Sequence, residues 1–235
     1  MLKVELHSHT SADPHDYIPH STNELIDRAG ALGYGALAIT LHDCYLDVRG
    51  FREYARDRGI TLISGVEKTV EGKHVLLINF DGEAEATDSF EKLARLRQSQ
   101  PSGLVVAPHP FYPARSCLGE LLETYAGLFD AVEFNAFYTA ALNHFNQWAV
   151  RWAHRAGKPV VANADIHRLR QLGTTFTLVD APPDPDAICE AIRAGRIEIQ
   201  TRPLTSIEAA TYMADLTLGQ LAVMRRSRKT RSSLG

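Results

Sequence analysis

The feature that most constrains this sequence is a pair of histidines, His7 and His9, at the end of a β-prone run. Leu2, Val4 and Leu6 alternate with polar residues before the pair, which predicts a strand. Successive strand side chains point to opposite faces, so two histidines two positions apart lie on the same face. Two imidazoles on one face at a strand end make half of a transition-metal site.

A single His-x-His pair also occurs by chance, so later strand ends have to be considered with it. Further candidate ligands end later strand-like runs: His15, His42, Glu67, His74, His109, Asp165 and His167. Asp165 and His167 repeat the two-residue spacing, so both are expected to face the same way. The alternative for each residue is a hydrogen-bonded core or surface side chain.

Short apolar runs alternate with segments of helical periodicity. The expected strands after the first are residues 36–41, 60–70, 74–78, 103–107, 131–135, 159–163 and 176–179. Such alternation implies parallel strands with helices outside, and the chemistry of such barrels lies at the carboxyl ends of the strands. The expected fold class is therefore α/β, a TIM-like barrel. In the helix expected after residue 142, Trp148 and Trp152 are predicted to be core residues, and a last amphipathic stretch spans residues 207–224.

The dipeptide Glu71-Gly72 separates two of these strands and is typical of a hairpin turn. If the turn has two residues, Thr69 faces His74, and Glu67 is the diagonal neighbour of His74 at about 7–8 Å between Cα atoms. One metal ion fits between two side-chain tips at that spacing. A longer loop would change the register.

Composition and charge narrow the class of protein. The 235 residues carry a net charge of −3, and the stretch 225–231 holds five positive charges, so the remainder has −8. An acidic body with ten histidines favours metal binding over a nucleic-acid coat. We expect one domain over residues 1–224 and a basic, disordered tail over residues 225–235.

Three separated cysteines without a CxxC motif argue against a disulfide framework. The sequence has no apolar run near the ~20 residues of a membrane span, and its first residues lack a signal-peptide pattern. The expectation is a cytoplasmic protein with no membrane partner. The sequence does not define an oligomeric state.

Five short motifs occur in order along the chain. They are Leu6-His7-Ser8-His9-Thr10, Ile39-Thr40-Leu41-His42, Gly65-Val66-Glu67, Pro108-His109-Pro110 and Ala164-Asp165-Ile166-His167. Over roughly residues 2–180 this pattern resembles the PHP (polymerase and histidinol phosphatase) family. The resemblance implies a distorted (β/α)7 barrel holding two or three divalent ions, usually Zn, Mn or Fe.

The resemblance also implies a distribution of ligands. His7, His9, Glu67 and Asp165 would hold the first ion; Glu67 would bridge to a second, completed by His74 and His109; His15, His42 and His167 would hold the third. A bridging carboxylate suits paired ions roughly 3.5–4 Å apart.

Two positions depart from the family pattern or leave it open. The family usually has Asp before the second-motif histidine, where this chain has Leu41, so an orienting group for His42 is missing from the motif. In the loop after His9, Asp13 or Asp16 could replace His15 as a ligand.

The resulting hypothesis is a metal-dependent phosphoesterase that hydrolyses a small phosphomonoester or nucleotide-like substrate by a metal-activated hydroxide. Glu67, Asp165 and His167 are the expected catalytic residues, and His167 or His15 would be the general acid if the third ion is absent. The alternatives are a phosphodiesterase or nuclease acting on nucleic acid, a metal-dependent C–N or ester hydrolase, and a non-catalytic metal-binding module. Nucleic acid is a possible partner that the acidic body does not favour.

A phosphorylated substrate calls for polar or cationic contacts at the barrel mouth. The candidates are Arg115, after the Pro108-His109-Pro110 turn, then Arg168 and Lys68, with Asn135 at a strand end. The alternative for each is an ordinary solvated surface residue.

Overall fold

The computed structural model describes residues 1–215 and residue 217. Its strands are β1 (Leu2–Glu5), β2 (Ala36–Ile39), β3 (Thr61–Val70), β4 (Lys73–Ile78), β5 (Leu104–Ala107), β6 (Ala131–Asn135), β7 (Val160–Asn163), β8 (Thr175–Val179) and β9 (Ile197–Thr201). Its α-helices are α1 (Thr22–Ala31), α2 (Arg52–Arg56), α3 (Phe90–Ser99), α4 (Leu121–Thr124), α5 (His144–Ala156) and α6 (Pro185–Arg193), with further helical residues at 206–215. Short 3₁₀ turns are η1 (Val48–Phe51), η2 (Gly82–Ala86), η3 (Ala126–Leu128) and η4 (Leu169–Gln171).

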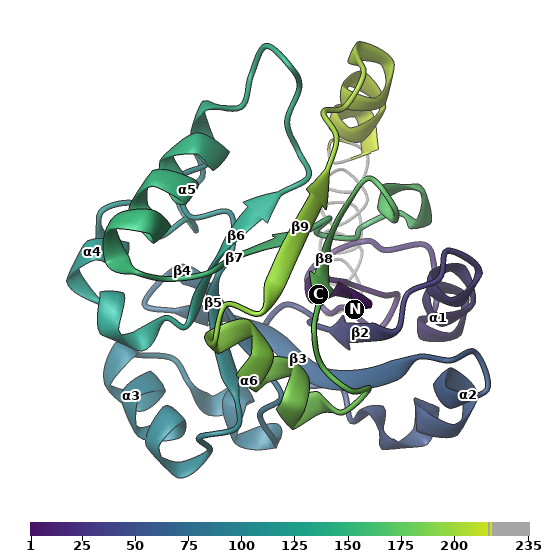
Figure 1. The fold of residues 1–235 in the computed structure, drawn as a ribbon, viewed down its shortest axis with the longest axis horizontal. Helices are drawn as coiled ribbons and strands as arrows, with labels where there is room; N and C mark the ends of the chain where they lie inside the picture. Colours follow the sequence, from purple (N-terminus) through teal and green to yellow (C-terminus); the bar gives the residue numbers. More distant parts are fainter. Residues whose placement is uncertain (216, 218–235) are drawn as a thin grey trace, which may run out of the picture.

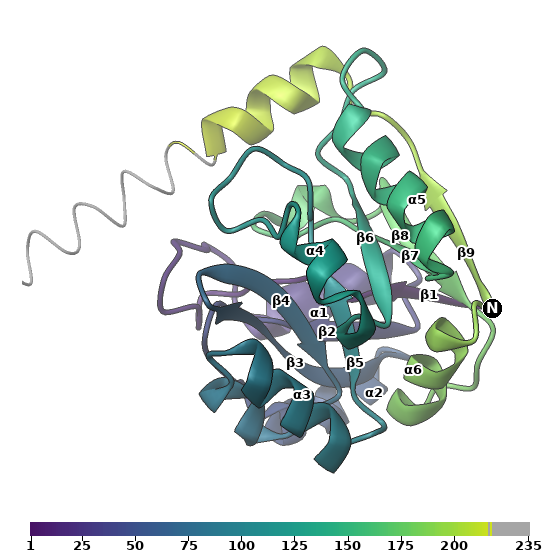
Figure 2. The ribbon, with the colours of Figure 1, turned by 90° about the vertical axis from the view of Figure 1, so that its left-hand side faces the viewer.

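Within the described residues the strands form one sheet in the order β7-β6-β5-β4-β3-β2-β1-β8-β9. The sheet curls into a nearly closed barrel, and helices lie around its outer side (Figures 1 and 2). The Thr177 hydroxyl of β8 joins the two ends, accepting from the Ala162 N–H of β7 at 2.8 Å and donating to the Ala162 carbonyl at 3.0 Å. The predicted α/β, TIM-like architecture is confirmed.

The interior of the barrel is apolar toward one end. Alternate side chains of the strands, such as Val4, Ala38 and Val106, pack with Ile188 and Ile192 of α6 in one buried cluster. Because α6 fills this end with apolar side chains, the other end, where most strands finish, is the one open to polar residues.

Local sequence rules explain why α1 begins and α5 ends where they do. Ser21 accepts from the Glu24 N–H and Glu24 accepts from the Ser21 N–H, a capping box that starts α1. Gly157 ends α5 in the left-handed conformation, with φ of 63°. Each cap hydrogen-bonds backbone groups that a helix end would otherwise leave unpaired.

The strands are not all parallel. β4 runs antiparallel to β3 and β5, and β8 runs antiparallel to β1 and β9. The Glu71-Gly72 turn reverses the chain between β3 and β4 without the crossover that a parallel pair would require. The connections β4–β5 and β8–β9 contain the helices α3 and α6. Strand β9 was not among the sequence predictions, because its residues are half exposed and lack a continuous apolar run.

The prediction that both tryptophans of α5 are core residues is correct for Trp152 and wrong for Trp148. Trp152 is 3% exposed and donates to Glu123 Oε2, whereas Trp148 is 45% exposed. Trp148 lies one turn earlier, where its ring contacts are His144 and Phe145 of the same helix.

Part of the predicted amphipathic stretch is helical, at 206–215. The remainder of that stretch, the predicted boundary at residue 224 and the basic tail lie outside the described residues. Among the residues that are described, none belongs to a helix long and apolar enough to cross a membrane.

We expect Thr177→Val to destabilise the barrel, because the fully buried hydroxyl that joins β8 to β7 is lost while side-chain volume is kept. The loss should be about 1–3 kcal/mol, since it leaves a buried backbone N–H without its partner. Urea unfolding followed by circular dichroism measures it. Thr211→Val, which removes a hydroxyl bonded to Ile207 O on the last helix, is the control; equal midpoints for the two variants would contradict the role of Thr177.

Candidate metal centre

The segments after β1 and β7 lie side by side at the open end of the barrel. The His9 N–H donates to Ile166 O and the Ile166 N–H donates to His7 O, both at 3.0 Å. The buried Glu5 carboxylate accepts from the His7 and Ala164 N–H groups and so holds the two segments together. These bonds bring the His-x-His and Asp-x-His pairs face to face.

The β3–β4 hairpin supplies the next two ligands. Thr69 pairs with His74 across the turn, which is the register that a two-residue Glu71-Gly72 turn predicts. Both turn residues have positive φ, 48° for Glu71 and 78° for Gly72, the conformation such a turn needs. Since β4 is antiparallel, its first residues share the edge where β3 ends, and His74 Nδ1 lies 2.7 Å from Glu67 Oε1.

Two ligand positions have a backbone that non-glycine residues seldom adopt. The φ of His109, directly after β5, is 30°, and the φ of Asp165, after β7, is 51°. Each costs conformational energy of order 1–3 kcal/mol, and such residues concentrate at functional sites. Here the turn aims both side chains into the same cluster.

Glu67 is the centre of that cluster. Its Oε2 lies 3.2 Å from His7 Nε2, 3.3 Å from His9 Nε2 and 3.0 Å from His42 Nε2. Its Oε1 lies 2.7 Å from His74 Nδ1 and 3.1 Å from His109 Nε2. A carboxylate with imidazoles at both oxygens is arranged as a bridge between two cation positions.

The cluster leaves several buried polar atoms without a hydrogen bond. These are His7 Nε2, His9 Nε2 and Asp165 Oδ1. The Asp165 oxygen lies 3.3 Å from His7 Nε2 and 3.5 Å from His9 Nε2, without hydrogen-bond geometry. Buried polar atoms are rarely left unpaired, and here three of them converge. Neutral imidazole nitrogen and carboxylate oxygen are the donors that Zn, Mn and Fe accept, so the residues present fit divalent metal ions.

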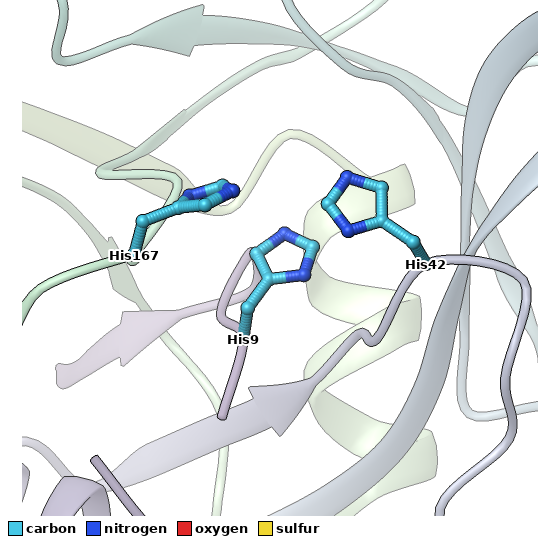
Figure 3. A group of neighbouring side chains, drawn as sticks. All are labelled: His9, His42 and His167. Carbon is cyan, nitrogen blue, oxygen red and sulfur yellow. The ribbon is translucent and has the colours of Figure 1, made fainter. Parts of the chain in front are cut away.

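Ligand atoms within 4.8 Å of one another define several groups of three. They are His7–His9–Asp165, His42–Glu67–His74, His7–His109–Glu133 and His9–His42–His167. The last group comes from three separate segments whose imidazoles converge (Figure 3).

The structure therefore brings together eight of the nine predicted ligands, and His15 lies apart. His15 is exposed, and its N–H donates to Asp13 Oδ1. Asp16 Oδ2 lies 3.1 Å from His167 Nε2. Asp16 is therefore placed where a ligand from this loop would complete the third group. Between the open alternatives for this loop, we favour Asp16.

Two carboxylates hold the histidines from behind. Asp13 Oδ2 accepts from His9 Nδ1 at 3.0 Å and from His42 Nδ1 at 2.9 Å, and Glu133 Oε1 lies 2.9 Å from His7 Nδ1. A carboxylate on the second ring nitrogen leaves Nε2 free for a metal and raises its basicity. Asp13 thus supplies the orienting group that Leu41, buried in the core, does not.

Glu133 and Cys117 were not among the sequence predictions. The only signal for Glu133 was an acidic residue inside the apolar run 131–135, where it is completely buried. Besides His7, Glu133 accepts from the His109 N–H and from the Asn163 amide. The Cys117 thiol lies 3.4 Å from His109 Nδ1, a contact across the 110–117 loop that no motif spacing indicates.

The proximity of opposite charges shifts the pKa values of this cluster. Burial opposes the charge on Glu67, but the imidazoles of His7 and His42 outweigh it and hold its pKa well below the usual range. Burial also opposes the charge on His7, where Asp165 and neighbouring carboxylates reverse the effect and raise its pKa. For His167 the same balance raises the pKa to about 10. Without metal, protons on the imidazoles balance the negative charges of the carboxylates in the cluster.

The predicted substrate contacts are arranged differently from expectation. Arg168 donates to the carbonyls of Tyr17 and His167, and Lys68 pairs with Asp43 at 2.8 Å. Arg115 is exposed. Their role in substrate binding remains a prediction.

A pocket of about 360 Å³ opens above the cluster. Its lining includes metal-ligand candidates together with Tyr112, Asn135, Phe137, Gln171 and Tyr212. The Asn135 amide donates to Glu133 and its carbonyl accepts from the Phe137 N–H, so this side chain also supports the site. In the described part of the chain, no lysine or arginine lines the pocket.

Metal binding should release protons. Because His167 has its pKa raised to about 10, it is protonated near neutral pH and must lose that proton to become a ligand. Affinity for Zn²⁺ should therefore fall as the pH is lowered. Isothermal titration in two buffers of different protonation enthalpy measures the proton count; pH-independent binding without proton release would contradict this account.

Asp13→Asn should lower metal affinity about 10–100-fold, because the carboxylate that orients two ligand histidines is lost. Competition with a chromophoric chelator measures the affinity. The control is Asp88→Asn, which removes an exposed carboxylate paired with Lys92. If both variants bind metal as the unmodified chain does, Asp13 does not orient the ligands.

Comparison with known proteins agrees with this architecture. Residues 143–197 match the family model described as PHP-associated. The chain is 33% identical over 102 residues to a 5'-3' exoribonuclease of Haemophilus influenzae, an alignment that covers 42% of this chain and 34% of that protein. The chain thus spans about a third of the length of that relative.

Two solved structures share the fold. A two-domain protein from Bacteroides vulgatus that contains a predicted PHP-like metal-dependent phosphoesterase superposes with a TM-score of 0.66 at 20% identity, over 86% of this chain and 65% of that one. PsfC from Pseudomonas syringae superposes with a TM-score of 0.64 at 17% identity, over 94% of this chain and 98% of that one. The chain thus has the fold of proteins that contain a PHP-like domain, and its residues 143–197 match the PHP-associated family model.

Proposed function

We propose that the protein hydrolyses the phosphomonoester bond of a small substrate, with two or three divalent ions of Zn, Mn or Fe. The observation that carries this proposal is the position of Glu67, a buried carboxylate with imidazoles at both oxygens. Such a bridge suits a two-metal site for in-line displacement at phosphorus.

We assign the ligands to three positions. The first is His7, His9, Glu67 and Asp165; the second is Glu67, His74 and His109; the third is His9 or Asp16 with His42 and His167. When bound, the ions supply Lewis acidity, lower the pKa of water and neutralise phosphate charge.

The residues of the chain perform the remaining tasks. Asp13 and Glu133 fix the imidazole rings of His7, His9 and His42, so that Nε2 of each of these three faces the cluster. Asp165, held by its turn, adds negative charge next to His7 and His167. Of the two histidines considered as general acid, only His167 lines the pocket.

The shape and charge of the pocket favour a small monoester. A volume of about 360 Å³ accommodates a molecule of nucleotide size. A binding groove for a nucleic-acid backbone generally carries lysines and arginines, and the described lining of this pocket has neither.

Cleavage of a nucleic-acid phosphodiester is the second candidate, because the Haemophilus influenzae relative is an exoribonuclease. The same metal arrangement serves mono- and diesters, so the substrate class depends on the groups around the metals rather than on the metals themselves.

The test uses protein purified without chelator or nickel. Its metal content is measured by elemental analysis, and its hydrolysis of p-nitrophenyl phosphate is compared with that of bis-p-nitrophenyl phosphate. Two to three equivalents of metal and faster hydrolysis of the monoester are expected.

Glu67→Gln should lower kcat/KM for the monoester by more than about 100-fold, because loss of an orienting residue alone costs roughly 10–100-fold. Glu198→Gln, on the exposed strand β9, is the matched control. Faster cleavage of the bis ester would favour the phosphodiesterase. Bound metal without turnover of either ester would favour a C–N or ester hydrolase or a non-catalytic module, and absence of metal would overturn the proposal.

A further inference from the structure

The pocket has an aromatic wall that the metal chemistry does not require. Tyr112, Phe137 and Tyr212 line it together with the metal-ligand candidates. They come from the loop after β5, the loop after β6 and the helical residues 206–215, all outside the five motifs. A phosphate group gains nothing from an aromatic surface, whereas the organic part of a substrate does.

The rings of Phe137 and Tyr212 are nearly parallel, with an interplanar angle of 15° and centroids 6.4 Å apart. A directly stacked pair in the same protein, Phe90 and Tyr125, has its centroids at 3.8 Å and an angle of 12°. Phe137 and Tyr212 therefore line one pocket with nearly parallel rings, and a planar group is the shape that stacks on such surfaces.

The two rings are held by different parts of the chain. The Phe137 N–H donates to Asn135 Oδ1 and the Phe137 carbonyl accepts from the Tyr112 hydroxyl, both at 2.8 Å. These bonds fix one ring relative to Asn135, which in turn contacts Glu133 of the metal centre.

The helical residues that carry Tyr212 are held at two places. Just before them, the Leu204 N–H donates to Tyr138 O at 2.8 Å, next to Phe137. Three residues after Tyr212, Asp215 pairs with Arg170 and with Arg168, which follows His167 directly. The segments that carry both rings are therefore connected to those of the metal-ligand candidates, and little ordering is needed when a substrate binds.

We propose that Phe137 and Tyr212 form a clamp for the base of a nucleotide whose phosphate lies at the metal cluster. This inference rests on the proposed function and names its substrate class. A nucleobase supplies the flat π surface that the rings accept, and base stacking on aromatic side chains tolerates any base. Ser116 and Gln171 also line the pocket. The Gln171 oxygen accepts from the His167 and Arg168 N–H groups, so its NH2 group is the part that could reach the polar edge of the base.

A binding experiment tests the clamp without depending on catalysis. Saturation-transfer NMR is recorded with adenosine and with ribose on the full chain. Adenosine base protons should receive saturation from the protein, while ribose should not, and the signal should disappear in the Phe137→Leu/Tyr212→Leu variant. Trp148→Leu, which removes an exposed aromatic residue outside this pocket, is the control and should keep the signal.

Kinetics then distinguish a clamp from a structural role. The ratio of kcat/KM for AMP to kcat/KM for ribose 5-phosphate should fall about tenfold in Phe137→Leu and in Tyr212→Leu, mainly through KM for AMP. Tyr212→Phe, which keeps the ring, should restore the ratio. Equal losses for both substrates would mean that the rings only support the fold, and the clamp would be overturned.

The outcomes separate the clamp from the proposed function. Adenosine binding without hydrolysis of any phosphate ester would refute the proposed function and support the clamp. Hydrolysis of phosphomonoesters with no preference for AMP over ribose 5-phosphate, and no base signal, would refute the clamp and support the proposed function. Preference for the dinucleotide pApA over AMP would support the clamp and assign it to the end of a nucleic acid strand.

Discussion

The structure depends on the Glu67 carboxylate, whose burial requires opposite charges next to it. Glu67 is 1% exposed, and transfer of an isolated carboxylate to such an environment costs far more than an average hydrogen bond returns. The cost is offset because imidazoles from β1, β2, β4 and β5 converge on its two oxygens. Opposite charges, either protons on the imidazoles or metal ions, are therefore a requirement of the fold.

Backbone hydrogen bonds, rather than long side chains, bring the imidazoles close to Glu67. Segments 7–9, 40–43 and 165–167 continue the sheet beyond its strands through isolated bridges, Ser8 with Ile166 and His42 with Glu67. Side-chain positions at a sheet edge are then set by register, with a spacing of two residues. The His-x-His and Asp-x-His spacings follow directly, because only alternate residues face the cluster.

The sequence predicts those parts of the site that depend on local rules. The i, i+2 pairs at strand ends follow from strand geometry, and the contact between His74 and Glu67 follows from the turn residues Glu71-Gly72. The antiparallel course of β8 was missed because alternation of buried and half-buried residues does not indicate the direction of a strand. Strand β9 was missed because its residues are exposed or half exposed and lack a continuous apolar run. Asp13 was placed in the correct loop, but its two contacts depend on a loop path that no periodicity encodes.

Residues that act across the sheet are harder to infer. The role of Glu133 depends on closure of the barrel, which brings β6 next to His7 although β6 and β1 are not neighbours in the sheet. The pairing of Phe137 with Tyr212 depends on the helical residues 206–215 returning over the β6 loop. Both are consequences of tertiary closure. Motif order thus identifies the proposed metal ligands, whereas the proposed substrate contacts come from loops and a helix outside the motifs.

This separation has a physical basis. Metal ligands must match a coordination geometry within a few tenths of an ångström, so they belong on the sheet edge, where register and backbone bonds hold them. The aromatic wall needs only a flat surface at roughly the right distance, and loops or a terminal helix can supply it without disturbing the sheet. In this chain, Asn135 joins the two parts: one end of its amide contacts Glu133 and the other holds the Phe137 backbone. A substrate bound at Phe137, as we propose, would therefore lie close to Asn135, the side chain that supports His7 through Glu133.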